Sequence, residues 1–229
     1  MTLAQRTQFA LVLTLITIAA LGATCSGCVP FWASSRAPAQ QYNAAVMLHM
    51  GCVGVTPEGE FVAQVYDGTG TVIGPHSILT AAHMTACPIE GFSAIAYAVD
   101  PGDGRLRPFT VDVVVPGADI ATLKVADDLS KWLTPVTIGP VPKFGETVCE
   151  SSAAPRPTYR CGLVQAPALG TEDGDIRLDL FIEHGNSGSG LYDSKGRLVG
   201  VVVLVSVCQG DFQCQGRASS LASRKWLVP

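Results

Sequence analysis

Residues 109–125 read FTVDVVVPGADIATLKV, and this stretch decides the fold class. Apolar residues occupy positions 109, 111, 113 and 115 in its first half and positions 121, 123 and 125 in its second half. Alternation with a period of two is typical of β-strands that bury one face. The stretch therefore predicts two half-buried strands.

The same alternation recurs at 61–66 and 176–182. The 24 glycines and 15 prolines favour many turns between short strands. Residues 127–142 contain several prolines and little strand pattern, so they indicate a connector between two β-rich halves. We therefore expect an all-β protein built as two packed barrels. Near the C-terminus, residues 220–227 fit either a short closing helix or a strand.

The composition excludes several classes of protein. Of the 229 residues, 48% are hydrophobic and 15% are charged, values that exclude disorder through most of the chain. The formal net charge is -4 and no basic block occurs, so we expect no nucleic-acid partner. The histidines and cysteines form no metal-ligand cluster in the sequence. We expect neither a metal nor an organic cofactor.

The N-terminus has the outline of an export signal. Residues 9–24 carry no charge and follow one cation, Arg6. This run is shorter than the ~20 residues that span a bilayer, although residues up to 33 would lengthen it into a retained anchor. Ser26-Gly27-Cys28 resembles the end of a bacterial lipoprotein signal, so lipid attachment at Cys28 and ordinary cleavage both stay open. We expect a secreted or cell-envelope protein, with a signal at 1–28 and a tether at 29–43.

The cysteines also favour export. Six of the eight follow the signal region, and an even number argues for three disulfides in an oxidising compartment. Two pairs are close enough in sequence to close locally, and elimination leaves a third. The expected pairs are Cys149 with Cys161, Cys208 with Cys214, and Cys52 with Cys87.

Three polar residues are candidates for catalysis. His83 ends Thr80-Ala-Ala-His83, Asp119 precedes an alternating strand, and Ser187 lies in His184-Gly-Asn-Ser-Gly-Ser-Gly190. Each alone is more typical of a structural histidine, a turn aspartate or a loop serine. Together and in this order they resemble the chymotrypsin-like (trypsin-like) serine proteases, in which TAAH, D-x-A-x-L-x-V and G-[DN]-S-G recur.

The resemblance covers nearly all residues after the tether. The cysteine hairpin at 149–161 is similar to that of the α-lytic protease and streptogrisin group, and Gly185-Asn-Ser-Gly-Ser189 is similar to the glutamyl endopeptidases. The resemblance implies two six-stranded antiparallel barrels with the active site in the cleft between them. The protease domain would span 44–229, with a first barrel at about 44–126 and a second at about 143–229.

The resemblance also implies a role for each candidate. A serine hydroxyl is a weak nucleophile, so His83 would take the proton of Ser187 while Asp119 orients and stabilises the imidazole. The backbone amides of Gly185 and Ser187 would hold the oxyanion. Ser189 also lies between glycines, but it does not follow Gly-Asn. No histidine follows Ser187, which argues against the serine, acid, histidine order of α/β-hydrolases.

Two departures from trypsin bear on activation and specificity. Asn186 stands where zymogen-activated trypsins carry aspartate, so an N-terminal salt bridge is not expected. Alignment with the family places Phe181 where trypsins carry the acid that selects Lys or Arg. A narrow pocket for small apolar residues and a glutamate pocket through His184 both stay open. The expected pocket residues are Phe181, His184, Val203, Leu204 and Val205.

These inferences predict an exported serine endopeptidase that acts on polypeptides as a monomer. Any membrane attachment would run through the N-terminus. The alternative is a catalytically inactive binding module of the same fold. The presence of all three triad residues argues against that alternative.

Overall fold

The computed structural model describes residues 44–87, 89–99, 105–154, 156–165, 175–209 and 213–221. The expected signal and tether, and residues 222–227 of the expected closing segment, lie outside this range. All described residues belong to one compact unit, Arg36–Pro229. Among them, no helix combines the length and apolar character needed to cross a membrane.

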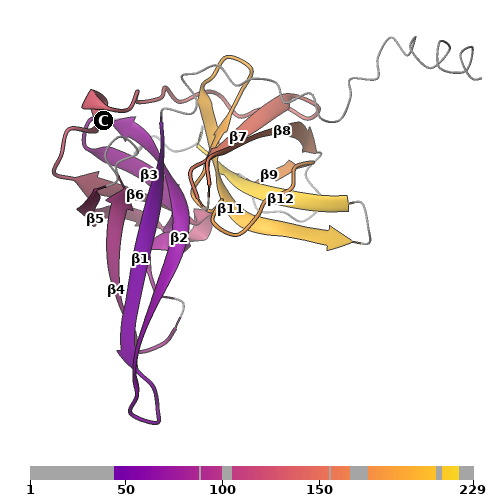
Figure 1. Ribbon diagram of the computed structural model, residues 1–229. Helices are drawn as coiled ribbons and strands as arrows, with labels where there is room; N and C mark the ends of the chain where they lie inside the picture. The colour runs from indigo at the N-terminus through magenta and orange to yellow at the C-terminus, as the bar shows by residue number, and fades with distance from the viewer. Residues whose placement is uncertain are drawn as a thin grey trace, which may run out of the picture. The chain divides into compact units, whose positions relative to one another are not determined.

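The described residues form two closed antiparallel barrels of six strands each, which confirms the predicted fold class (Figure 1). The first barrel has the strand order β1-β2-β3-β6-β5-β4 and the second the order β10-β11-β12-β9-β8-β7. Closure gives every strand a partner on both sides, so neither sheet presents an open edge. The strands of the first barrel are β1 (Ala45–Val55), β2 (Phe61–Gly74), β3 (Ser77–Ala81), β4 (Ser93–Val99), β5 (Leu106–Val115) and β6 (Ile120–Val125). Those of the second are β7 (Thr147–Ser152), β8 (Thr158–Gln165), β9 (Asp175–Leu178), β10 (Gly190–Tyr192), β11 (Leu198–Gln209) and β12 (Gln213–Ser220).

Three short 3₁₀ turns connect these strands. They are η1 (Ala82–Thr85), η2 (Pro116–Ala118) and η3 (Leu129–Lys131). The first two lie at the ends of strands that carry site residues. The third begins the expected connector between the barrels.

The core has three apolar clusters. One fills the first barrel and includes Leu48 and Leu123, and one fills the second barrel. The third joins them, because Leu79 and Ile120 of the first barrel pack with Tyr192 of the second. Each of these three side chains is fully buried, and burial of a large apolar side chain stabilises by about 1.5–3 kcal/mol. The two barrels are therefore held together by this third cluster, which is separate from the core inside each barrel.

The expected strand at 109–115 forms, but it does not bury the expected face. Val111 and Val113 are 43% and 38% exposed. The pairing of β5 with β6 shifts between these two residues, and such a bulge can turn the side chains that follow it, but Val111 precedes the shift and its exposure has no explanation in this pairing. Alternation predicts the strand correctly, but it carries no information about the bulge.

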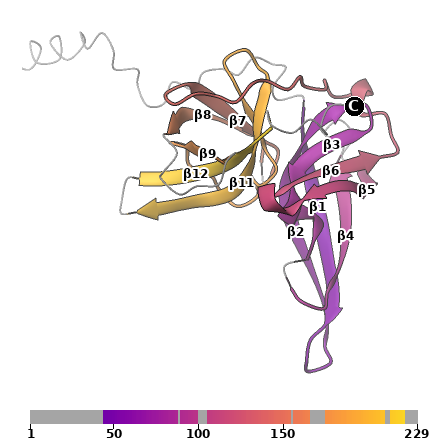
Figure 2. The ribbon, with the colours of Figure 1, turned by 180° about the vertical axis from the view of Figure 1, so that it is seen from behind.

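The expected strand at 61–66 is the start of β2, and its apolar face is also exposed. Phe61 and Val65 are 72% and 69% exposed. This half of β2 pairs with the end of β1 in a hairpin that extends beyond the rest of the barrel (Figure 2). At 176–182, β9 ends at Leu178, and the side chains of Leu180 and Ile182 are buried in the loop that follows.

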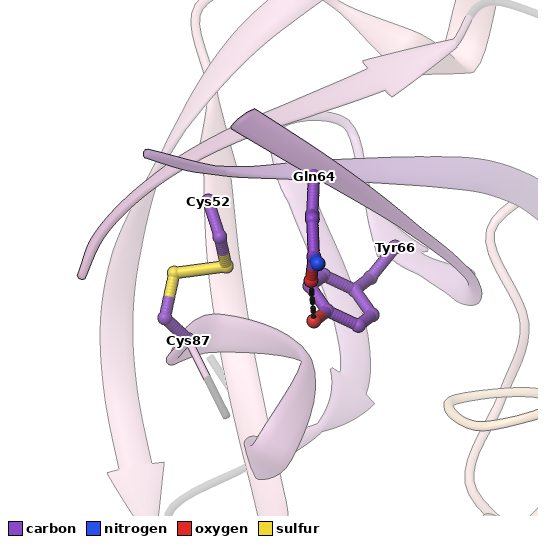
Figure 3. Close-up of a disulfide and its surroundings, with 4 residues drawn as sticks. All are labelled: Cys52, Gln64, Tyr66 and Cys87. Carbon is purple, nitrogen blue, oxygen red and sulfur yellow. Dashed lines mark hydrogen bonds between the residues drawn. A yellow bond between two sulfur atoms is a disulfide. The ribbon is translucent and has the colours of Figure 1, made fainter. Parts of the chain in front are cut away.

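Two of the expected disulfides are present. Cys52 of β1 is bonded to Cys87 just after η1, beside a hydrogen bond of 2.6 Å from the Tyr66 hydroxyl to Gln64 Oε1 (Figure 3). Cys149 of β7 is bonded to Cys161 of β8. Cys208 and Cys214 are register partners on β11 and β12, but their side chains lie outside the described ones. The two disulfides indicate an oxidising compartment outside the cytoplasm.

Removing either disulfide should lower the free energy of unfolding. Cys52 and Cys87 are 35 residues apart and Cys149 and Cys161 are 12 apart. Loop-closure entropy then predicts losses of about 4 and about 3 kcal/mol for the two double alanine variants. Urea unfolding of each variant against wild type measures the loss. A larger loss for the shorter loop would contradict the entropic account.

Candidate active site

Pairing of β3 with β6 brings His83 and Asp119 together. Ala81 at the end of β3 is the register partner of Ile120 at the start of β6. η1 continues from β3 and carries His83, while η2 leads into β6 through Asp119. Two residues 36 positions apart in sequence therefore meet at one end of the first barrel.

The carboxylate of Asp119 holds His83 at two points. The His83 backbone amide donates to Oδ1 at 2.8 Å, and His83 Nδ1 donates to Oδ2 at 2.7 Å. Asp119 adopts a left-handed conformation with φ 49°, the only positive φ among the described non-glycine residues. Because Nδ1 carries the proton in this pairing, Nε2 is left as the basic nitrogen.

The loop from β9 to β10 carries Ser187 and depends on two glycines. Gly185 and Gly188 have φ angles of 93° and 86°, and residues with a side chain rarely adopt such positive values. A Cβ on Gly188 would lie 1.9 Å from the carbonyl oxygen of Thr69. The loop therefore packs directly against the backbone of the first barrel.

Thr69 of β2 ties this loop to the first barrel. Its amide donates to the Ser187 carbonyl at 2.8 Å. Its hydroxyl donates to the Gly185 carbonyl at 3.0 Å and accepts from the amides of Ala153 and Ala154 at 3.2 Å. No local sequence pattern singles out Thr69, because its partners are distant in the chain.

Among the loop amides without a hydrogen-bond partner in the described part of the chain, two lie on either side of Asn186. They belong to Gly185 and Ser187, the expected oxyanion donors. The neighbouring amides are engaged, since Asn186 donates to Glu183 and Gly188 donates to Val202. The loop thus leaves the amides of Gly185 and Ser187, on either side of Asn186, as donors for a ligand.

Several candidate residues line one pocket of about 720 Å³. It is lined by His83, Ser187, Gly185 and His184, with Met84 and Asp67 among its walls. Within the described residues, no hydrogen bond joins the Ser187 hydroxyl to the His83 ring. Such bonds are often long in enzymes without substrate and tighten when it binds.

The expected specificity residues lie in different surroundings. Of the three whose side chains are described, His184 alone lines the pocket that contains His83 and Ser187. Phe181 is 47% exposed, with the Arg160 guanidinium 5.8 Å from its ring centroid. Val203 packs partly buried against the cluster between the barrels. The side chains of Leu204 and Val205 are not among the described ones.

A two-barrel fold in which a carboxylate-paired histidine and the serine of a Gly-Asn-Ser-Gly turn line one pocket defines the chymotrypsin-like class of proteins. The family described as Trypsin-like peptidase domain matches residues 68–201, more than half of the 229 residues. The chain belongs to this trypsin-like peptidase family. No curated protein matches it by sequence.

Solved structures support the fold. A serine-to-alanine variant of the HtrA-type protease AlgW, with a decapeptide, aligns with a TM-score of 0.65 at 20% identity, covering 79% of this chain and 61% of that one. AlgW with decapeptide aligns with a TM-score of 0.60 at 21% identity, covering 79% and 62%. This chain therefore spans about three fifths of the length of those proteins. Both are HtrA-type proteases, whereas the sequence motifs resemble two other bacterial groups.

Glu150 is a buried carboxyl beside this loop, and no sequence motif pointed to it. It lies in β7, has no exposed surface, and accepts a hydrogen bond from Asn186 Nδ2. Burial raises the pKa of Glu150 from 4.5 to about 7, and the nearby Glu183 acts in the same direction. The hydrogen bond from Asn186 and the charge of Arg160 lower the pKa of Glu150. The nearby Ser189 hydroxyl also lowers this pKa, although it does not reach hydrogen-bond geometry.

This raised pKa predicts a pH-dependent stability. The folded protein binds the Glu150 proton more tightly than the unfolded chain, so this carboxyl should weaken stability as pH rises from about 4.5 to about 7. Above that range the loss should reach on the order of 3 kcal/mol relative to Glu150→Gln, which stays neutral. Urea unfolding of both proteins from pH 4 to 8 measures the difference. Parallel pH curves for the two proteins would contradict the prediction.

Proposed function

We propose that the chain is a serine endopeptidase with Ser187 as nucleophile, His83 as general base and Asp119 as the orienting carboxylate. The observation that carries the proposal is that His83, paired with Asp119, lines the same pocket as Ser187 and Gly185, and that the amides of Gly185 and Ser187 have no partner among the described residues. These groups supply what acyl transfer needs.

The reaction would proceed through an acyl-enzyme. His83 Nε2 takes the hydroxyl proton as Ser187 Oγ bonds to the carbonyl carbon, and the amides of Gly185 and Ser187 hold the oxyanion. The imidazolium then gives its proton to the leaving amine as the peptide C–N bond breaks. A water molecule repeats the sequence to release the acid. No step requires a metal or an organic cofactor.

The substrate would be an extended polypeptide outside the cytoplasm. The AlgW structures contain a decapeptide, and we propose that this chain takes a peptide in the pocket lined by His83 and Ser187. It would act as a secreted or envelope-held monomer, with Cys28 as the lipid site if the signal is of the lipoprotein kind. An inactive binding module would need none of the proton-transfer groups that this pocket retains.

Replacing Ser187 by alanine should abolish peptide hydrolysis. Loss of a triad nucleophile lowers turnover by roughly 10⁴ to 10⁶. The mature protein is incubated with a mixed peptide library, cut sites are mapped by mass spectrometry, and labelling by diisopropyl fluorophosphate is measured in parallel. Wild type that neither cuts nor labels would refute the proposed function.

Ser189→Ala is the matched control for this experiment. The Ser189 side chain is fully buried, so a reagent in the pocket cannot reach its hydroxyl. The variant should therefore still be labelled. Labelling of Ser187→Ala at position 189 would instead transfer the nucleophile to Ser189.

The same cut-site map tests specificity. Because Phe181 stands where trypsins carry an acid, we expect cuts after small apolar residues such as Ala or Val, and not after Lys or Arg. One methylene in such a pocket is worth about 1 to 3 kcal/mol, so the preference should be graded. Cuts after Glu that disappear in His184→Ala would favour the glutamate pocket.

A further inference from the structure

Glu150 is a buried ionisable group that the triad mechanism does not use, and one hydrogen bond joins it to the loop that carries Ser187. Its cross-strand partners are Arg160 on β8 and Leu191 on β10. β10 begins directly after the loop that carries Ser187. The carboxyl is therefore held beneath that loop by paired strands on both sides.

Asn186 connects this carboxyl to the loop. Its Oδ1 accepts from the Glu183 amide at 2.9 Å, and its Nδ2 donates to Glu150 Oε1. Its backbone is also engaged, because the amide donates to the Glu183 carbonyl at 3.1 Å and the carbonyl accepts from Ser189 at 2.9 Å. Asn186 is 1% exposed, so water cannot replace a lost partner.

Asn186 lies between the amides of Gly185 and Ser187. The Ser187 amide belongs to the peptide unit that directly follows Asn186. The Gly185 amide lies on the other side, one peptide unit further away. Gly185, with φ 93°, has little steric resistance to an alternative backbone conformation. The direction in which these donors point therefore depends on how firmly Asn186 is held.

We propose that Glu150 is a positioning residue that fixes the oxyanion-binding loop through its hydrogen bond to Asn186. This inference rests on the proposed peptidase function. Glu150 touches no reacting atom, and its effect would pass through Asn186 to the amides of Gly185 and Ser187. Without it, buried Nδ2 would lose its acceptor and the side chain would be free to leave its site.

The test compares Glu150→Ala with Glu150→Gln, which keeps an acceptor oxygen in the same place. Misplaced oxyanion donors weaken transition-state binding more than substrate binding. Glu150→Ala should therefore lower kcat by about 10- to 100-fold with KM changed less than about 3-fold, and should slow labelling of Ser187 comparably. Glu150→Gln should stay within about 3-fold of wild type in kcat.

Val148→Ala is the control for a merely structural effect. Val148 is fully buried on the same strand, in the core of the second barrel. Its truncation should lower stability and leave kcat of the folded fraction unchanged. If Glu150→Ala behaves in the same way, the proposal is overturned. Equal losses of kcat in Glu150→Ala and Glu150→Gln would also overturn it.

A second variant covers failure of Glu150→Ala to fold. Asn186→Ala removes the same hydrogen bond from the other end, and should show the same loss of kcat at nearly constant KM. Full activity of Asn186→Ala would overturn the proposal. Each outcome presupposes active wild type, so an inactive wild type refutes the proposed function, whereas active wild type with unaffected variants refutes only the role of Glu150.

Discussion

The arrangement of the site depends on one threonine of the first barrel, Thr69, whose hydrogen bonds reach the backbone of the second barrel. The amide of Thr69 binds the Ser187 carbonyl, and its hydroxyl binds the Gly185 carbonyl and the backbone after β7. Thr69 is fully buried, and its own carbonyl accepts from the Thr80 hydroxyl at 2.9 Å. Each buried polar group left unpaired would cost about 1–3 kcal/mol, so the loop is stable in this form only when both barrels are in place. Neither barrel contains the site by itself.

The other half of the site depends on strand register. His83 and Asp119 meet because Ala81 pairs with Ile120, and a shift of one residue would turn their side chains to opposite faces. The buried Leu79 and Ile120 fix this register, since both belong to the cluster between the barrels. The same apolar contacts therefore align the histidine with its carboxylate and fasten the first barrel to the second. Packing and site geometry cannot be varied independently here.

Much of this could be predicted from the sequence, because alternation reports strands and the three motifs report local loop geometry. The fold class and the Cys149–Cys161 disulfide followed from such local patterns, and the Cys52–Cys87 disulfide followed by elimination. The exposure of Phe61 and the bulge in β5 did not, since a projecting hairpin and a register shift depend on pairing that a single strand does not encode. Thr69 and Glu150 were missed for a related reason. Their partners lie 116 and 36 residues away, and nothing local distinguishes a buried anchor from an ordinary strand residue.

Closure of both sheets bears on how well such a protein would resist cleavage by other molecules of the same protein. To be cut, a peptide bond must enter a protease cleft as an extended segment without strand partners, and paired strands offer none. The projecting β1–β2 hairpin would be the obvious exception, yet its tip is a tight turn, with Thr56 donating to Glu60 at 2.9 Å and Gly59 donating to Thr56 at 2.9 Å. If the proposed peptidase activity holds, the architecture that keeps Ser187 in place also protects the described strands from self-digestion.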